Sequence, residues 1–243
     1  MIVLPMKLSP CKLALDKDCA DLWVINTHEL VPYQGRLHSF LDGEERQKLQ
    51  RFTNLEAKAT FLYSRGLLRF LTSCYTGSEP QKVRISTGNH GKPYIEEAEN
   101  FFFNLSHSGG LLAYLFAGYP VGLDIEDSRR KIELEPIMKR FFSLTEIESW
   151  KKFSAANEKL SFFRGWTRKE AFLKATGEGI SGLSHSTVSF EPNQRKALTS
   201  RFGKNDENEF WFFYDLQMPE FFVGSAVIKH KELALRQRSL LEI

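Results

Sequence analysis

The stretch FFFNLSHSGGLLAYLFAGYPVGLDIE, residues 101–126, decides the fold of this 243-residue chain. Two apolar runs, 101–106 and 111–117, flank the polar turn His107-Ser-Gly-Gly110 and predict an antiparallel hairpin. Glycine and proline then break the chain near its midpoint, and residues 121–126 predict a further strand.

Helical signals flank these strands on both sides in the sequence. Apolar residues at helical spacing predict helices over 42–74, 134–142 and about 157–175. Ser143-Leu-Thr-Glu146 has the form of a capping box and predicts a helix start, and Gly177 is expected to end the last helix. Weaker signals predict strands at 83–86, 186–190, 210–216 and 221–227, a turn at 88–93 and a loose tail after Lys231. Because both halves show a helix followed by a hairpin, we predict a duplicated α+β unit, with lobes at residues 1–118 and 119–243.

The composition is that of a globular protein without a strong charge bias. Hydrophobic residues make up 42% and charged residues 26% of the chain, and the net charge is +3. Such a charge is too small to indicate nucleic-acid binding. Residues 139–174, however, hold nine Lys/Arg against four Glu. A basic region like this suits a phosphate-bearing or acidic partner, and a solvated surface equally.

The cysteines and the N-terminus favour a cytoplasmic protein. Cys11, Cys19 and Cys74 show no metal spacing and predict no disulfide framework, which fits a reducing compartment. The apolar start is interrupted by prolines and Lys7, so it resembles neither a signal peptide nor an anchor. The longest apolar runs fall short of the roughly 20 residues of a spanning helix, and we expect no membrane association.

Two carboxylates and a charged helix are the main chemical features. Asp124 and Glu126 lie two residues apart on a predicted strand, so they share a face, with Gly122 beside them leaving room for a ligand. A solvated strand face would give the same pattern. On the helix, Glu170 and Lys174 are spaced for a surface ion pair, but the many aromatic residues around them indicate a largely buried helix. Buried charges need a partner, and three carboxylates beside lysines predict Mg²⁺ and a polyphosphate.

Polar residues in two turns offer phosphate donors. Ser106 and His107 lie between apolar runs and are adjacent, which does not suit a catalytic Ser–His pair but does suit phosphate contact. Lys92 lies in the glycine-rich turn 88–93. Arg65, on an apolar helix, and Lys92 are ambiguous by themselves.

Together, these motifs resemble the 4′-phosphopantetheinyl transferases, in particular the larger two-lobed, surfactin-synthetase-activating type. The matching segments, in order, are Gly91-Lys92-Pro93, Asn104–Ser108, Val121–Glu126, Lys139–Ser143 and Trp166–Gly177. The resemblance implies a monomer with two α+β lobes related by a pseudo-twofold axis, and with coenzyme A bound in the cleft between them.

The resemblance also implies a role for each matched residue. The expected Mg²⁺ ligands are Asp124, Glu126 and Glu170. The expected coenzyme contacts are Arg65, Lys92, Ser106, His107, Asp124, Lys169 and Lys174. Glu170 is also the candidate to accept the proton of a carrier serine, and Lys174 to stabilise the leaving group. Some relatives have two coenzyme-binding lysines near residues 44–48, where this chain offers Lys48 and Arg46.

The reaction implied is transfer of 4′-phosphopantetheine from coenzyme A to a serine of an acyl or peptidyl carrier protein, with release of 3′,5′-ADP. Two other hypotheses stay open at this point. One is a metal-dependent nuclease, which usually has its Glu-x-Lys on a strand. The other is a coenzyme A or carrier-binding module without activity. The sequence does not indicate which carrier is modified.

Overall fold

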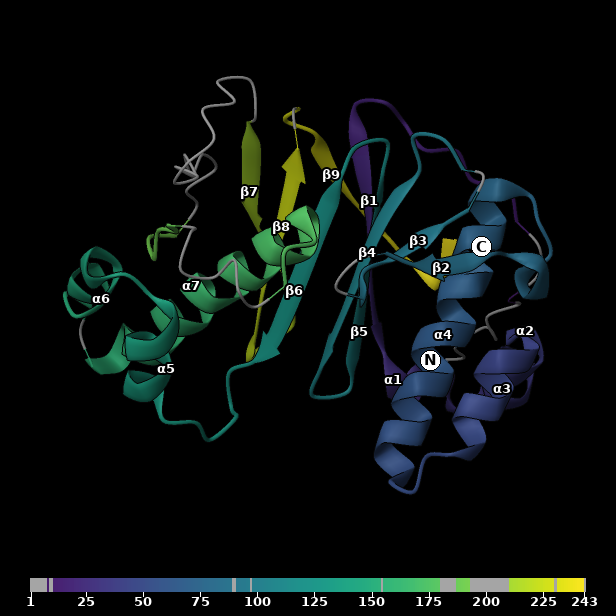
Figure 1. The fold of residues 1–243 in the computed structure, drawn as a ribbon, viewed down its shortest axis with the longest axis horizontal. Coiled ribbons are helices and arrows are strands. Elements are labelled where there is room, and N and C mark those ends of the chain that lie inside the picture. Colours follow the sequence, from purple (N-terminus) through teal and green to yellow (C-terminus); the bar gives the residue numbers. More distant parts are fainter. Residues whose placement is uncertain are drawn as a thin grey trace.

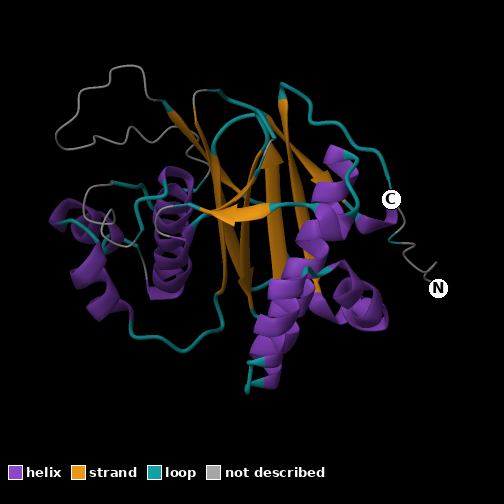
Figure 2. Ribbon diagram, turned by 45° about the vertical axis from the view of Figure 1, so that its right-hand side comes forward, coloured by secondary structure: helices purple, strands orange, loops and turns teal. Residues whose placement is uncertain are grey.

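Two β-sheets pack against each other in the middle of the molecule, and a long helix covers the outer side of each (Figures 1 and 2). The computed structural model describes residue 8 and residues 11–88, 91–96, 98–153, 155–179, 187–192, 210–229 and 231–242. The first sheet has the strand order β4-β5-β1-β9, and the second has the order β6-β8-β7. A separate two-stranded sheet pairs β2 with β3. The strands are β1 Cys19–Asn26, β2 Ile85–Thr87, β3 Pro93–Ile95, β4 Phe102–Ser108, β5 Leu111–Ala117, β6 Val121–Asp127, β7 Trp211–Asp215, β8 Phe222–Lys229 and β9 Ala234–Arg238.

The sequence of β5 shows why the sheets are layered in this way. All seven of its residues are buried, and they alternate between two apolar clusters. Leu112, Tyr114 and Phe116 face the cluster that contains α4. Leu111, Ala113, Leu115 and Ala117 face the second sheet. A strand that is apolar on both faces has to lie between two layers, because successive side chains point to opposite sides.

The two long helices are α4, Leu55–Thr76, and α7, Ala155–Thr176. The α4 helix packs on the first sheet, whereas α7 packs along β6 and β8 of the second sheet (Figure 1). Gly177 ends α7 in the left-handed conformation, as predicted. The shorter helices are α1 Thr27–Leu30, η1 Val31–Tyr33, α2 Gln34–Phe40, α3 Gly43–Gln50, η2 Pro80–Lys82, α5 Leu134–Phe141, α6 Leu144–Trp150 and η5 Leu240–Glu242.

Most predicted elements are confirmed, including the hairpin β4–β5, the capping box of Ser143 and Glu146, and an α+β architecture. The prediction of one helix over 42–74 is wrong, because the segment forms α3 and α4. Asn54 starts the second helix: its Oδ1 accepts a hydrogen bond from the Ala57 N–H at 2.9 Å.

The C-terminal region also differs from the prediction. The tail after Lys231 contains β9, which pairs in parallel with β1, and is therefore not loose. The described residues 187–190 lie outside any strand, although Val188 and Phe190 are buried, and Ser186 lies outside the described residues. The lobe boundary at 118/119 stays a prediction. Of the predicted turn at 88–93, Asn89 and His90 are outside the described part.

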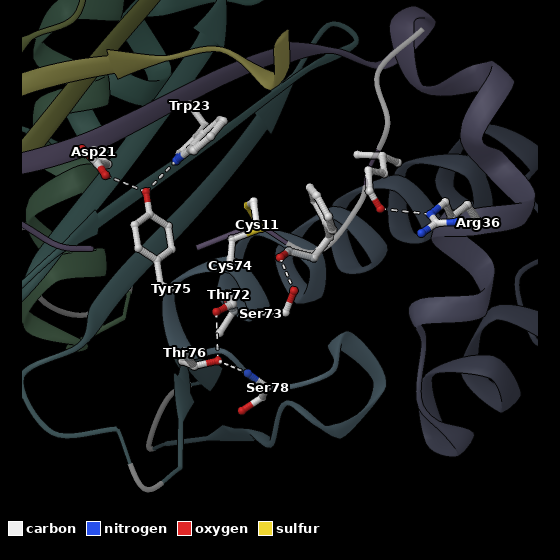
Figure 3. Close-up of a disulfide and its surroundings, with 12 residues drawn as sticks. Cys11, Asp21, Trp23, Arg36, Thr72, Ser73, Cys74, Tyr75, Thr76 and Ser78 are labelled. Carbon is white, nitrogen blue, oxygen red and sulfur yellow. Dashed lines mark hydrogen bonds between the residues drawn. A yellow bond between two sulfur atoms is a disulfide. The ribbon is translucent and has the colours of Figure 1, made fainter. Parts of the chain in front are cut away.

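A disulfide bond joins Cys11 to Cys74 at the end of α4, so the expectation of unpaired cysteines is wrong (Figure 3). The Leu13 N–H also donates to the Cys74 carbonyl at 2.8 Å, which holds the N-terminal segment along this helix. Cys19 is a free cysteine. The two bonded residues are 63 positions apart, and pairing at such a distance in sequence depends on the tertiary fold. None of the helices in the described residues combines the length and hydropathy of a membrane-spanning segment.

Candidate active site

Asp124 of β6 is a buried carboxylate with its two oxygens in different environments. Oδ1 accepts hydrogen bonds from the Ser106 hydroxyl at 2.9 Å and the Lys174 ammonium at 2.7 Å. Oδ2 is buried and has no hydrogen-bond partner among the residues that the structure describes. Burial raises the pKa of Asp124, and the neighbouring Lys174 charge opposes this effect. Leu123 and Ile125 point into the core between the sheets, as the alternation predicted.

Glu126 lies two residues further along β6 and is half-buried. Its Oε2 accepts hydrogen bonds from the Ser108 hydroxyl at 2.9 Å and from Nη1 of Arg130 at 2.7 Å. The Ser108 and Arg130 contacts were not foreseen from the sequence, although Asn104, Ser106 and Ser108 alternate along β4 in a way that marks one polar face. Asp124 and Glu126 are therefore each held by one hydroxyl and one cation.

The α7 helix brings Glu170 and Lys174 to these carboxylates. Lys174 bonds to Asp124 and Ser106 on other elements, so the alternative of a simple Glu170–Lys174 surface pair is not what the structure contains. Glu170 is half-buried. Burial first, and then the charges of Asp124 and Glu126, raise the pKa of Glu170, whereas Lys174 lowers it. The three predicted carboxylates thus lie near enough to influence one another.

The close approach of α7 to β6 depends on Gly122. A Cβ atom at this position would lie 1.8 Å from the carbonyl oxygen of Ala171. The expectation that Gly122 makes room for a ligand is therefore wrong, because the space is filled by the α7 backbone. The glycine acts indirectly, since it lets the helix that bears Glu170 and Lys174 approach the strand that bears Asp124.

Lys92, from the first half of the chain, hydrogen-bonds to β6 and α7 in the second half. Its Nζ donates to the Ala175 carbonyl at 2.8 Å and to the Val121 carbonyl at 3.2 Å. Burial lowers the pKa of Lys92 to about 8. Together with Asn104, Glu170 and Lys174, it lines a pocket of about 240 Å³ whose walls come from both halves of the chain. The other lining residues are Gly91, Pro93, Leu105, Leu173, Gly177 and Gly179.

Arg65 and His107 line two neighbouring pockets instead. Arg65 lies in a pocket of about 730 Å³ together with Lys48 and Arg51, and its Nε is 3.5 Å from Oε1 of Glu45. His107 is exposed and lines a pocket of about 480 Å³. Phe52 and Phe61 line both pockets, so the two hollows adjoin. Lys48 and Arg51 are thus available beside Arg65 in this pocket.

Lys169 does not join the other predicted residues. Its side chain is fully buried, its Nζ lies 3.0 Å from Oε2 of Glu146, and it is 4.7 Å from the ring centre of Phe142. Glu146 also accepts hydrogen bonds from the Val188 and Ser143 backbone. This ion pair therefore links α6, α7 and the segment 187–190.

The cluster of Asp124, Glu126 and Glu170 has the chemistry to bind a divalent cation, although the three side chains do not converge as metal ligands do. Among the described residues, no three His, Cys, Asp or Glu side chains converge closely enough to hold a metal ion. The cations of Lys174 and Arg130 neutralise Asp124 and Glu126 instead. Oδ2 of Asp124 is buried without a partner in the described part of the chain, and burial together with the charges of Asp124 and Glu126 raises the pKa of Glu170, so added positive charge would stabilise both carboxylates. Hard oxygen donors of this kind suit Mg²⁺.

A pocket lined by Glu170, Lys92 and Lys174, with the carboxylate of Asp124 bonded to Lys174 behind it, is of the class that suits anionic substrates. Comparisons with known proteins place the chain more narrowly. Residues 120–229 match the model of the 4′-phosphopantetheinyl transferase superfamily, and residues 32–117 match the 4′-phosphopantetheinyl transferase N-terminal model. The chain belongs to this superfamily.

Individual relatives support the same assignment. The 4′-phosphopantetheinyl transferase HetI of Nostoc sp. is 35% identical over 78% of this chain and 81% of its own length. The 4′-phosphopantetheinyl transferase Sfp of Bacillus subtilis is 36% identical over 60% of this chain and 64% of its own length. The L-aminoadipate-semialdehyde dehydrogenase-phosphopantetheinyl transferase of Schizosaccharomyces pombe is 32% identical over 65% of this chain and 69% of its own.

Proposed function

We propose that this protein transfers the 4′-phosphopantetheine group of coenzyme A to a serine of an apo acyl or peptidyl carrier protein and releases 3′,5′-ADP. Membership of the transferase superfamily supports the reaction. The observation that carries the proposal in this chain is that Glu170 and Lys174 line a pocket shared by both halves, and that Lys174 also bonds to the buried carboxylate of Asp124. This pocket also supports the proposal that coenzyme A binds in a cleft between two lobes related by a pseudo-twofold axis.

Asp124, Glu126 and Glu170 are the proposed ligands of Mg²⁺. When bound, the ion would supply positive charge to the pyrophosphate of coenzyme A. Lys174 lies against Oδ1 of Asp124, and its side chain is 30% exposed. It is therefore placed to turn from the carboxylate to a phosphate once the carboxylate has another counter-charge.

The residues that bind the nucleotide part are proposed from their positions. Lys92 and Lys174 supply ammonium groups to the 240 Å³ pocket. Ser106 and His107 lie near the end of the strand β4, and Arg65 with Lys48 and Arg51 supplies positive charge to the neighbouring pocket. Lys169 is left out of this proposed set because its buried amine already pairs with Glu146.

In the transfer step, the oxygen of the carrier serine forms a bond to the β-phosphorus of coenzyme A. The bond between that phosphorus and the bridging oxygen of the pyrophosphate breaks, and 3′,5′-ADP leaves with the bonding electrons. Lys174 stabilises the negative charge on the leaving phosphate. The serine proton passes to Glu170, directly or through water, because the raised pKa of this carboxyl suits it to accept a proton.

The two alternatives are less well supported. A nuclease of the Glu-x-Lys type usually carries these residues on a strand, whereas Lys169 and Glu170 lie within the helix α7. A binding module without activity would be expected to lack a site residue, and all three carboxylates are present on β6 and α7. We therefore prefer the transferase.

The cellular setting is also a proposal. Coenzyme A and carrier proteins meet in the cytoplasm, and we propose that this monomeric protein acts there, without nucleic acid or membrane as partners. The argument from unpaired cysteines no longer supports this location, since Cys11 and Cys74 are bonded.

Intact-protein mass spectrometry of an apo carrier protein tests the proposal. After incubation with this protein, coenzyme A and Mg²⁺, the carrier is expected to gain the mass of one phosphopantetheine, and EDTA should abolish the gain. Fatty-acid, polyketide and peptide carriers are tested in parallel. Bound coenzyme A without a mass gain on any carrier would instead support the non-catalytic module.

A further inference from the structure

Ser106 of β4 binds β6 through two bonds of its hydroxyl group. The Oγ atom donates to Oδ1 of Asp124 at 2.9 Å. The same atom accepts the backbone N–H of Ile125 at 3.3 Å. One hydroxyl thus fixes both a carboxylate and the backbone of the residue that follows it.

Ser108 repeats this arrangement two residues later on both strands. Its Oγ donates to Oε2 of Glu126 at 2.9 Å and accepts the backbone N–H of Asp127 at 3.0 Å. Because residues i and i+2 of a strand share a face, the two serines and the two carboxylates stay in register. Ser108 therefore makes the same two contacts, with the carboxylate of Glu126 and the next backbone N–H, that Ser106 makes beside Asp124.

These contacts replace a backbone ladder between two sheets. β4 and β6 belong to different sheets, yet they lie alongside each other in Figure 1 and are in extensive contact. Asn104 adds a third link, because its Oδ1 accepts the Leu123 N–H at 2.8 Å. The backbone donors of residues 123, 125 and 127 are thus satisfied by side chains of β4, as buried N–H groups require.

The hydroxyls also decide which carboxylate oxygen is left for a cation. On Asp124, the serine and Lys174 both bond to Oδ1, and Oδ2 is the buried oxygen without a partner in the described part of the chain. On Glu126, Ser108 and Arg130 both bond to Oε2. In each case the hydroxyl and the cation share one carboxylate oxygen, so the other oxygen is the one on which a further ligand would bind.

We propose that Ser108 is a positioning residue of this enzyme, which holds Glu126 in the orientation needed to bind the divalent cation. The inference rests on the proposed function, in which Glu126 is a metal ligand. Ser108 separates the positioning role from substrate contact better than Ser106 does, because Ser106 also bonds to Lys174 and is a proposed coenzyme contact. Groups that orient a metal ligand are typically worth 10- to 100-fold in metal affinity.

The test compares Ser108→Ala with Ser108→Thr, which keeps the hydroxyl, and with the matched control Ser128→Ala. Ser128 lies just beyond β6, and its hydroxyl bonds to the Phe221 carbonyl instead of a carboxylate.

Mn²⁺ affinity is measured by electron paramagnetic resonance in the presence of coenzyme A, and the Mg²⁺ dependence of transfer is measured separately from the KM for coenzyme A. We expect Ser108→Ala to weaken Mn²⁺ binding about 10- to 100-fold and to raise the Mg²⁺ requirement similarly. The KM for coenzyme A at saturating Mg²⁺ should change less than threefold, and Thr should restore most of the affinity.

Should Ser108→Ala fail to fold, Ser108→Cys keeps a side chain of similar size with a much weaker donor and replaces it in the same measurements. Equal metal affinity in wild type and the folded variant, with wild-type transfer intact, would overturn the role of Ser108 alone. Wild-type protein that neither binds Mn²⁺ nor modifies any carrier would overturn the proposed function and this inference with it. An equal loss of affinity in Ser128→Ala would show a general effect of loosening the end of β6, which also contradicts a specific role.

Discussion

Asp124 is buried, and the charge of Lys174 only partly offsets the cost of burying its carboxylate. We predict that Asp124→Asn lowers kcat/KM about 1,000-fold, because a metal ligand supplies several kcal/mol to the transition state. The fold should persist, since the amide is of the same size. Steady-state transfer assays and thermal unfolding measure the two effects. Asp127→Asn is the control, because this buried carboxylate of the same strand pairs with Arg129. Near-native transfer by Asp124→Asn would contradict the assigned site.

Lys92 predicts a pH dependence of coenzyme binding. Burial lowers its pKa to about 8, so its ammonium loses charge as the pH rises through that value. If phosphate binding needs the charged form, affinity for coenzyme A should fall about fivefold between pH 8 and pH 9. The same lowered pKa should make the free energy of unfolding rise over the interval from about 8 to 10.5, because there the unfolded chain binds more protons.

Isothermal titration calorimetry with coenzyme A across this pH range provides the measurement for Lys92. In Lys92→Arg the charge persists to higher pH, so the affinity profile should become flat between pH 8 and 9. A profile of the arginine variant as steep as that of wild type would assign the pH dependence to other groups.

Single residues were predicted well where a motif fixes both residue type and element. Asp124, Glu170 and Lys174 come together as expected. Lys169 shows where a motif does not place a side chain. Adjacent helix residues point about 100° apart, so Lys169 does not point where Glu170 does, and its amine pairs with Glu146 of another helix. Ser108 was missed because its partner, Glu126, belongs to a strand of the other sheet.

At the scale of elements, the contact between α7 and β6 sets the geometry of the site. We predict that Gly122→Ala destabilises the protein by about 1–3 kcal/mol or more, because its Cβ would meet the Ala171 backbone, which has little freedom to move. The shift of α7 should also separate Lys174 from Asp124 and reduce transfer. Chemical denaturation and transfer assays measure both effects. Gly43→Ala is the control, since a Cβ there meets no atom within 4 Å. Equal stability of the two variants would show that α7 adjusts without cost.

The predictions of helices and strands were correct where they depended on neighbouring residues. They were wrong where the element depends on tertiary contacts. The strand β5 and the capping box of α6 were predicted from neighbouring residues alone, and both are confirmed. The break between α3 and α4 was missed because the apolar period runs across it, and the cap at Asn54 is a single side chain. Val188 and Phe190 are buried although they lie outside any strand, so apolar residues in this segment did not by themselves define a strand.

At the scale of the whole molecule, both ends of the described chain pack on the first half. β9 pairs with β1, and Arg236 and Arg238 lie beside the fully buried Asp21. Tyr75 donates to the same Asp21 and accepts from the Trp23 indole, as Figure 3 shows. The pairing of β9 with β1 and the contact between Arg236 and Asp21 span more than 200 residues, which explains why neither strand could be assigned from local sequence.

The Cys11–Cys74 bond gives a prediction for the stability of the whole chain. For a loop of 63 residues, the chain-entropy account gives about 4 kcal/mol of stabilisation, which acts on the unfolded state. We therefore expect a reducing agent, or Cys11→Ser, to lower the free energy of unfolding by about 2–4 kcal/mol, measured by urea denaturation with and without reductant. Cys19→Ser is the control and should keep the response to reductant, because Cys19 is a free thiol. An identical denaturation midpoint in oxidised and reduced wild-type protein would mean that the bond does not form in solution.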